Sequence, residues 1–478
     1  MDIGLISLLG ILFAMGLLIW GSFKGVPILL LGPLTAIIIL ATSDMDIVEG
    51  LTNNYAESFA GFAQSNFLIF LPATILGAML GDCGAAQHIA NKIASISQRR
   101  GGKNSKFWVL MGLSLITAIL SFGGVSGFVV IFTIAPICFR IFKQMDIPWH
   151  FVIAVSVYGG SMWTAILPGS PAIQNLIPME YLGTSPRSAP MIGIFAALSC
   201  LVFGAVYIWW MLKRNERRGE GFMETGKKMD TYSSTLALES TGKEMDTHSS
   251  TLALKSTDKK MDTYSSTLAL KITEIETTNW DFVKALLPSI AMLVAMNVFL
   301  ITPFVSLTIG CLVCIALYYN KFTNLSNTLS SGALSTMKSI MNVAAVVGFG
   351  GVVNIVPGFD FLVENLDKIP GPPLIQLALA TNIVSGIVGS ASGGEAISLE
   401  VFASRFLEAG INPNVIHRIV NISCYGLDSL PHNGSAINRL NYTHLTYREG
   451  YYHEFILGAI YPLLNSFLAV FIASLGII

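Results

Sequence analysis

Residues 426–435 of the chain read Gly-Leu-Asp-Ser-Leu-Pro-His-Asn-Gly-Ser, between apolar segments of a chain that is 53% hydrophobic and only 12% charged. Pro431 has no N–H to donate, and its ring clashes with the carbonyl four residues earlier. A helix that runs into this stretch must therefore break or kink. What such a break means depends on whether water, protein or lipid surrounds it.

The surrounding chain is a series of apolar runs long enough to cross a hydrocarbon core of about 30 Å. Clear examples are residues 3–20, 107–120, 189–212 and 455–478. A soluble protein rarely repeats such runs, so the sequence predicts an all-α polytopic protein of the inner (plasma) membrane. The first run carries Asp2, has no basic region before it and no cleavage site after it, which indicates a retained span.

Charge and cysteine content exclude several classes of function. The 28 Lys and Arg residues balance 29 Asp and Glu residues, so no basic excess indicates a nucleic-acid partner. The six cysteines lie scattered through apolar runs, and no second Cys pair or His cluster completes a metal site. We therefore expect neither a metal nor another cofactor.

Charge is concentrated in one segment, residues 213–280, which we expect to be a cytoplasmic loop. The sequence MDTYSSTLAL begins at Met229 and again at Met261, and MDTHSSTLAL begins at Met245, so the repeat period is 16 residues. The repeats are polar and balanced in charge, which is typical of disorder. The loop divides the chain into a first membrane half, residues 1–212, and a second, residues 281–478.

Basic residues at the ends of spans predict the orientation. They gather in residues 92–106, at Arg140 and Lys143, and in residues 213–218, whereas residues 43–50 and 178–186 are acidic or neutral. With the basic clusters in the cytoplasm, seven passes precede the loop and the N-terminus lies outside. Some of these passes can be re-entrant half-helices. Another seven apolar segments follow the loop.

The two halves resemble each other in sequence. SFGGVSG at 121–127 corresponds to SASGGEA at 390–396, and residues 157–176 correspond to residues 424–440. The offsets between matching positions are 270 for Gly123 and Gly393, 267 for Tyr158 and Tyr425, and 263 for Pro168 and Pro431. An odd number of passes in each half makes the two halves antiparallel. This is the inverted repeat of many secondary transporters, which contain broken helices or re-entrant hairpins.

Broken helices at matching positions indicate a substrate site at the middle of the membrane. In lipid, such breaks persist only inside protein or beside a water-filled cavity. The Gly/Ser strings supply helix N-termini whose free N–H groups favour anions, although small residues also allow helices to pack closely. The candidate substrate-binding residues are Ser121, Gly123, Gly124, Ser126, Thr164, Ser170, Asn175, Ser392, Gly393, Gly394, Asn433 and Ser435.

Within the matching motifs, only the second half carries ionisable residues. Glu395, Asp428 and His432 have no ionisable counterpart at the matching first-half positions. Because a charge inside a membrane is costly and usually functional, these three are the candidate ion-coupling residues. Asp428 and His432 are four residues apart and could pair to carry a proton. The alternative is a salt-bridged strut that fixes the break.

Three strings together resemble the gluconate permease family of proton symporters, in particular its hydroxybutyrate-permease branch. They are GLDSLPHNGSAINRL followed by LTYREGY, LGDCGAAQHIANKI, and FGGVSGFVVIF. The resemblance covers the chain except residues 219–279, where the repeats depart from the family. It implies an ion-transporter-type fold, a scaffold that forms homodimers, and proton-coupled uptake of small hydroxylated monocarboxylates such as gluconate or 3-hydroxybutyrate.

Other classes of function remain open. A sodium-coupled carboxylate symporter is possible, because carbonyls freed at Gly393 or Gly426 could bind Na⁺. A membrane-embedded hydrolase could use Asp428, His432 and Ser435, but a catalytic triad is defined by geometry, and three groups around one proline rarely converge. An ion channel is disfavoured because inverted halves indicate alternating access. The sequence therefore predicts a transporter and no enzymatic activity.

Overall fold

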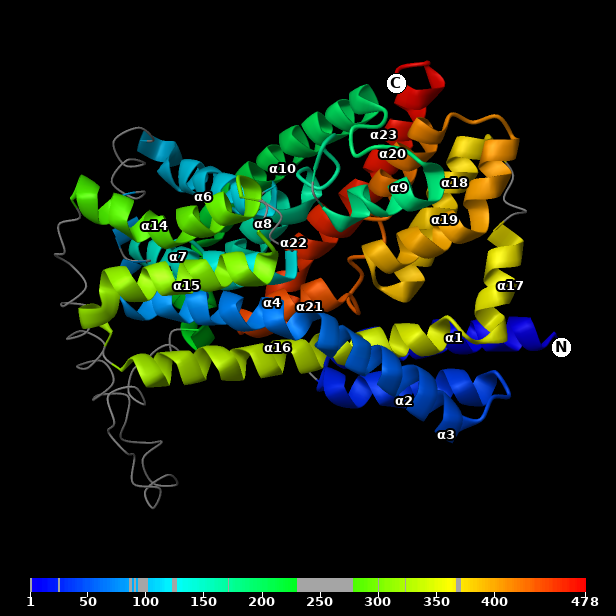
Figure 1. Cartoon of the computed structure of the whole chain (residues 1–478), viewed down its shortest axis with the longest axis horizontal. Helices are drawn as coiled ribbons and strands as arrows, with labels where there is room; N and C mark the ends of the chain where they lie inside the picture. Colours follow the sequence, from blue (N-terminus) through cyan, green and yellow to red (C-terminus); the bar gives the residue numbers. More distant parts are fainter. Residues whose placement is uncertain are drawn as a thin grey trace.

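A computed structural model describes residues 2–24, 26–85, 88–89, 92, 102–122, 127–170, 172–229, 278–299, 301–322, 324–366 and 371–478. Every regular element in these ranges is helical (Figure 1). Six of the described helices are long and apolar enough to cross a membrane. The predicted all-α polytopic membrane protein is thereby confirmed.

The first half forms a set of helices that ends with the long helix α10. In order they are α1 (Ile3–Phe23), α2 (Ile28–Thr42), α3 (Ile47–Glu49), η1 (Gly50–Tyr55), α4 (Ala56–Asp82), η2 (Gly102–Asn104), α6 (Ser105–Phe122), α7 (Gly127–Met145), α8 (Phe151–Val157), η3 (Tyr158–Met162), η4 (Ile173–Asn175), α9 (Ile177–Leu182), α10 (Pro190–Arg218) and α11 (Phe222–Thr225). The repeats at 230–270 lie outside the described residues.

The second half is likewise a series of helices in the part of the chain that the structure describes. Its elements are α14 (Asn279–Asn297), α15 (Pro303–Tyr318), η6 (Tyr319–Lys321), α16 (Leu325–Val353), α17 (Pro357–Leu366), α18 (Pro373–Val388), α19 (Ala391–Glu408), α20 (Pro413–Ser423), α21 (Gly434–Tyr442), η7 (Tyr447–Tyr451), α22 (Tyr452–Glu454), η8 (Phe455–Ile460) and α23 (Tyr461–Ser474). The seven expected segments are present, whereas α17 was not expected.

The arrangement of the two hairpins supports antiparallel halves. In Figure 1, α6 and α7 lie toward the left end of the molecule, and α18 and α19 lie toward the right end. The packing also repeats: α7 packs on α21, and α19 packs on α9. We call α6 with α7 the first hairpin and α18 with α19 the second hairpin. Each hairpin contacts the helix that follows the break in the other half.

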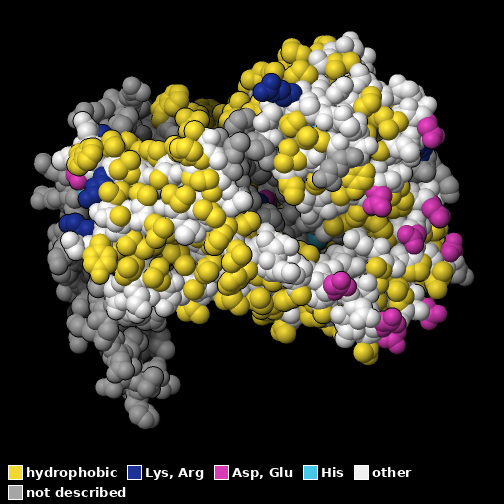
Figure 2. Space-filling view, viewed as in Figure 1, with side chains coloured by type: hydrophobic (Ala, Val, Ile, Leu, Met, Phe, Trp, Pro, Cys, Tyr) yellow, Lys and Arg dark blue, Asp and Glu magenta, His cyan; other side chains and the backbone are white. Residues whose placement is uncertain are grey.

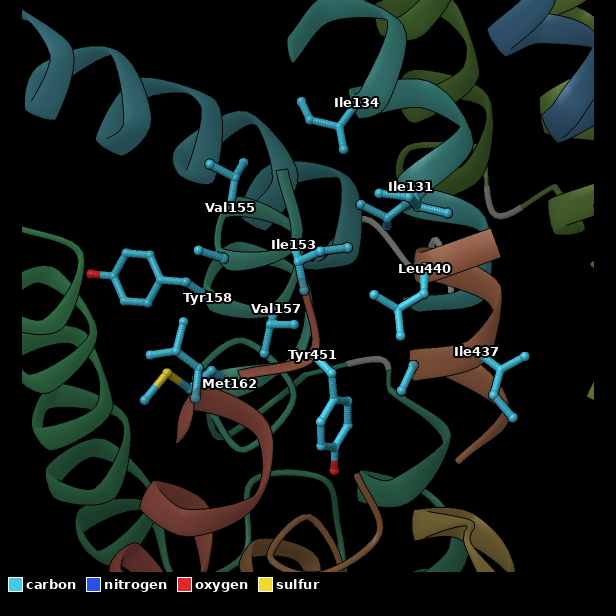
Figure 3. Close-up of a cluster of buried hydrophobic side chains, with 14 of the residues drawn as sticks. Ile131, Ile134, Ile153, Val155, Val157, Tyr158, Met162, Ile437, Leu440 and Tyr451 are labelled. Atoms are coloured by element: carbon cyan, nitrogen blue, oxygen red, sulfur yellow. The ribbon is translucent and has the colours of Figure 1, made fainter. Parts of the chain in front are cut away.

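A buried apolar cluster holds the two halves together beside these breaks (Figure 3). Ile131 and Ile134 come from α7, and Ile153 comes from α8. Ile437 and Leu440 of α21 approach them from the second half. Inside a membrane, such side chains hold helices together by close van der Waals packing. The cluster fixes where the breaks lie relative to each other.

The surface charge agrees with the expected orientation. In Figure 2, most of the visible Asp and Glu side chains lie at the right end of the molecule, and Lys and Arg gather at the left end, apart from one basic group at the top. The N-terminal end of α1 lies at the acidic end (Figure 1). Because basic residues favour the cytoplasmic side, this arrangement supports an N-terminus outside the cell.

Candidate functional site

Both predicted helix breaks are present. The first broken helix ends at Met162 and the second at Ser423. Pro168 lies in the loop that follows the first broken helix, which we call the first loop. Pro431 lies in the loop 424–433, which we call the second loop. A further helix follows each loop. The proline pattern therefore located both breaks from the sequence.

Two tyrosines satisfy backbone carbonyls in the second loop. The Tyr451 hydroxyl donates to the carbonyl of Ser429 at 2.8 Å, and the Tyr447 hydroxyl donates to the carbonyl of Pro431 at 2.7 Å. A buried carbonyl without a donor costs about 1–3 kcal/mol. The two hydroxyls therefore stabilise the open backbone of this loop.

A buried arginine does the same for the first loop. Arg418 of α20 donates from Nη1 to the carbonyl of Ile166 at 3.1 Å, and from Nη2 to the carbonyls of Pro186 at 3.0 Å and Ser188 at 2.8 Å. Its side chain is fully buried. One guanidinium thus satisfies one carbonyl inside the first loop and two carbonyls in the segment between α9 and α10.

Asn175 is held by protein groups on all sides. Its Nδ2 donates to the carbonyls of Ser170 and Pro186, both at 2.9 Å. Its Oδ1 accepts from Arg418 Nη1 at 3.0 Å and lies 3.2 Å from His417 Nε2. The amide that we expected to face the substrate is used in this structure to join the first loop to α20.

Ser121 and Thr164 meet where the first hairpin contacts the first loop. The Ser121 hydroxyl donates to the carbonyl of Gly160 and lies 3.3 Å from the Thr164 hydroxyl. Thr164 and Ser170 are buried, and Ser121 is partly exposed. The other candidates of this hairpin, Gly123, Gly124 and Ser126, lie outside the described residues.

The second hairpin contacts the second loop through Asn433. Asn433 caps α21 by accepting from the N–H of Ala436 at 2.9 Å, and its Nδ2 donates to the carbonyl of Gly389 at 3.1 Å. Ser390 caps α19 by accepting from the N–H of Gly393 at 3.2 Å. Ser392 and Gly394 therefore lie in the first turn of a helix, as expected, and Gly394 also packs closely against α18.

The predicted pair of Asp428 and His432 is not formed. Asp428 accepts from the Ser429 hydroxyl at 3.0 Å and interacts electrostatically with Glu454 and Arg439. Among the described residues no ion pair joins Asp428 to His432. Because α20 ends at Ser423, the spacing of four residues does not place the two side chains on one helical face. The condition for a helical pair is therefore not met in this structure, and the role of the two residues in ion coupling stays a prediction.

Several buried polar atoms around the second hairpin make no hydrogen bond to any described residue. They include both carboxylate oxygens of Glu395, and beside them the His432 ring lies against the backbone of Gly386 and Ile387. Neighbouring atoms of this kind are Asn382 Oδ1, Ser385 Oγ and Ser423 Oγ. We call these five residues the polar cluster.

Close backbone contacts place Asn382, Ser385 and His432 of the polar cluster along α18 and its C-terminal end. Gly389 packs against the His432 ring, Gly394 against Ser385, and Gly426 against Asn382. Glu395 follows Gly394 directly, and it interacts electrostatically with Arg418 and with Cys424. Buried polar groups are normally satisfied, so a cluster without hydrogen bonds indicates a place for a proton, an ion, water or a polar ligand.

The first half has a similar but uncharged group. Ser114, Ser156 and Trp163 each bury a polar side-chain atom that makes no hydrogen bond to a described residue. Ser156 stands where the second half has Ser423, at the same offset of 267 as the two tyrosines. No carboxyl group belongs to this set. The asymmetry in charge expected from the sequence is therefore present in the buried site.

Sequence reasoning missed two buried arginines as structural elements. Besides Arg418, Arg439 of α21 forms an ion pair with Glu454 of α22, with Nε 2.8 Å from Oε2, and both side chains are buried. The signal was available, since an arginine inside an apolar run such as residues 413–430 is costly unless it is paired or hydrogen-bonded.

Comparisons with known proteins agree with a transporter. A family model described as a citrate transporter matches residues 1–392. An uncharacterized transporter of Bacillus subtilis, YxjC, is 29% identical over 453 residues, which cover 93% of this chain and 94% of that protein. An uncharacterized transporter of Haemophilus influenzae is 23% identical over 370 residues, 76% of this chain and 74% of that protein.

Proposed function

The chain belongs to the citrate transporter family as a multi-pass secondary transporter of the plasma membrane, not an enzyme, and we propose that it imports a small hydroxylated carboxylate by proton symport. The observation that carries the proposal is Glu395. Its carboxyl group is fully buried and makes no hydrogen bond to any described residue. In such a place a carboxyl group is stable when it holds a proton or a bound cation.

The choice of a proton over sodium follows from the backbone around the breaks. A sodium site needs several oxygen ligands, which carbonyls freed by a helix break could supply. The carbonyls of Ile166, Pro186, Ser429 and Pro431 accept hydrogen bonds from Arg418, Tyr451 or Tyr447 instead. We therefore assign the response to the coupling ion to Glu395, Asp428 and His432, while the carbonyls of Gly393 and Gly426 would serve a sodium ion. Sodium coupling is the alternative.

The substrate class follows from the positive charge near the two loops. Arg418 is engaged by backbone carbonyls and by two asparagine side chains, and Arg439 is paired with Glu454. Anion binding then relies on the hydroxyls of Ser392 and Ser435 and on the N-termini of α19 and α21, in whose first turns these two residues lie. Such a site suits one carboxylate, as in gluconate or 3-hydroxybutyrate, better than three.

Citrate is the second candidate substrate, because the matching family model is described as a citrate transporter. Three carboxylates would require more positive charge than the described loops offer, since carboxylates are bound most strongly by charged donors. Membership of the gluconate permease family and the homodimer that it implies stay predictions.

Uptake by purified protein in liposomes tests the proposal. Labelled 3-hydroxybutyrate, gluconate and citrate would be offered under a proton gradient alone and under a sodium gradient alone. We expect the proton gradient to drive accumulation of a monocarboxylate, with citrate a weaker competitor. Accumulation driven by sodium alone would contradict the coupling, and citrate outcompeting both monocarboxylates would contradict the substrate class.

A further inference from the structure

A chain of hydrogen bonds runs through two buried histidines outside the polar cluster. Asn215 Nδ2 lies 2.9 Å from His150 Nε2, His150 Nδ1 lies 2.8 Å from His453 Nε2, and His453 Nδ1 lies 3.0 Å from the Tyr207 hydroxyl. The Tyr452 hydroxyl forms a side branch, 2.8 Å from His150 Nδ1. The chain joins α8 and α10 of the first half to α22 of the second.

One end of this chain reaches a pocket on the side that we assign to the cytoplasm. Asn215 lines a pocket of about 170 Å³, together with Lys106, Asp146, Glu216 and Glu220. This volume has room for several water molecules. The pocket lies beside the basic end of α10, which carries Arg217 and Arg218 in its last turn. Water in the pocket can therefore approach the Asn215 end of the chain.

The other end adjoins the network around Asp428. His453 is followed on α22 by Glu454, which pairs with Arg439. Gly458 packs against both the Glu454 carboxylate and the Ser429 hydroxyl, which places these two groups beside each other. Ser429 in turn donates to Asp428. The hydrogen-bond chain itself ends at the Tyr207 hydroxyl, and His453 is joined to the Asp428 network through its neighbour Glu454 on α22.

We propose that His150 and His453 transfer the coupling proton between the Asp428 region and the cytoplasmic pocket, which rests on the proposed proton coupling. When a proton binds at His453 Nδ1, the proton on His453 Nε2 moves to His150 Nδ1. The Asn215 side chain, which contacts His150 Nε2 and lines the pocket, then turns aside, and the proton on this nitrogen leaves to water in the pocket. One proton enters the pair and one leaves it, and no other bond changes.

This chain of hydrogen bonds suits proton transfer because its donors and acceptors can be arranged in two opposite directions. In one, the Asn215 amide N–H donates to His150, His150 donates to His453, and His453 donates to Tyr207. In the other, every donor and acceptor is exchanged and the amide of Asn215 turns to offer its oxygen. An imidazole supports both patterns because either ring nitrogen can carry the proton.

The charges around the pair come from three directions. Arg214 on α10 interacts electrostatically with Tyr207 and Tyr452. Glu220 and Arg218 also act on Tyr452, and Asp146, Glu216 and Lys106 line the pocket. Glu454 is held by Arg439 on the inner side. Carboxylates therefore lie at the pocket end of the hydrogen-bond chain, where the proton leaves.

Glutamine variants test the transfer, because the glutamine side chain keeps a hydrogen-bond donor and an acceptor but does not take up a proton near neutral pH. His150→Gln and His453→Gln would be compared with the parent in liposomes, with labelled 3-hydroxybutyrate and citrate as probes. We expect uptake driven by a proton gradient to fall at least tenfold, and counterflow exchange without a gradient to stay within about twofold. Tyr319→Phe, at a tyrosine that is 66% exposed and outside this hydrogen-bond chain, should leave both rates within twofold of the parent.

Imidazole rescue gives a second measurement. His150→Ala opens space next to the pocket. Free imidazole should restore at least part of the proton-driven uptake of this variant. A purely structural role of His150 does not predict this rescue. Parental proton-driven uptake in both glutamine variants would overturn the proposal, and so would equal losses of driven uptake and counterflow. Sodium-driven uptake by the parent, with no response to a proton gradient, would instead refute the proposed coupling itself.

Discussion

Arg418 Nη1 lies 3.0 Å from Asn175 Oδ1, and this contact joins a helix of the second half to the segment that follows the first helix break. The same guanidinium satisfies the carbonyls of Ile166, Pro186 and Ser188. Since the two halves are separated by residues 213–280 in the sequence, this contact helps to fix their relative position. Arg418 therefore acts here as a structural anchor.

Arg418→Lys should destabilise the protein although it keeps the charge. A lysine ammonium has three donors on one atom and does not reproduce the planar fork that reaches these separate acceptors. We expect a loss of about 3 kcal/mol or more, because several buried carbonyls lose their donors. Thermal unfolding in detergent measures this, with Arg405→Lys on the partly exposed side of α19 as control. Equal unfolding temperatures for the two variants would contradict the anchoring role.

Tyr451→Phe should weaken transport by loosening the second loop. The substitution removes the donor to the buried carbonyl of Ser429, which costs about 1–3 kcal/mol. We expect a reduced rate of uptake and a lower unfolding temperature at unchanged membrane abundance. Tyr319→Phe is the matched control, because Tyr319 is 66% exposed. A Tyr451 variant that behaves like this control would show that the loop does not depend on the hydroxyl.

Gly389→Ala should abolish uptake. Gly389 has a φ of 67°, and a Cβ at this position would collide with the His432 ring. Gly410→Ala separates the two effects, because Gly410 has a φ of 77° but open space around it. Strain alone costs on the order of 1 kcal/mol, so the Gly410 variant should keep most of its activity. Similar uptake by both variants would argue against a close contact between the hairpin and the second loop.

Deletion of residues 230–270 should leave uptake within about twofold. Helix α10 ends in its own cap at Gly219, and α14 begins with a capping box formed by Thr278 and Asp281. Neither helix end therefore needs the repeats, and the deletion spares Met229, which packs against the core. Loss of uptake at normal membrane levels would show that the repeats take part in transport.

The breaks could be predicted from the sequence because their cause is local. Pro168 and Pro431 end a helix whatever surrounds them, and the Gly/Ser string at 390–396 marks the start of α19. Helix α17 could not be predicted as a span because it is only ten residues long and contains Asp360 and Glu364. The π-helical turns η1, η3, η7 and η8 also carry no simple periodic signal.

The roles of individual site residues were harder to predict because their partners lie far away in the sequence. In the sequence, Asn175 is a polar residue that follows a helix break. Its side-chain oxygen contacts Arg418 and His417 only in the folded protein. Asp428 and His432 are close in sequence, but the loop between them turns their side chains toward different neighbours. Local spacing predicts contacts only while the helix continues.

Glu395 and Asp428 are the residues on which the proposed proton coupling depends. Glu395→Gln removes a titratable group without breaking a hydrogen bond to any described residue, and Asp428→Asn can still accept from the Ser429 hydroxyl. Both variants should therefore fold and bind substrate. Glu408→Gln is the matched control, because Glu408 is exposed at the end of the same helix as Glu395.

The most direct test compares accumulation driven by a proton gradient with counterflow exchange for these variants in liposomes, across a range of external pH. We expect Glu395→Gln and Asp428→Asn to lose accumulation against a concentration gradient while counterflow remains measurable, and Glu408→Gln to match the parent in both. If the Glu395 and Asp428 variants accumulate substrate with the pH dependence of the parent, neither carboxyl group carries the coupling proton.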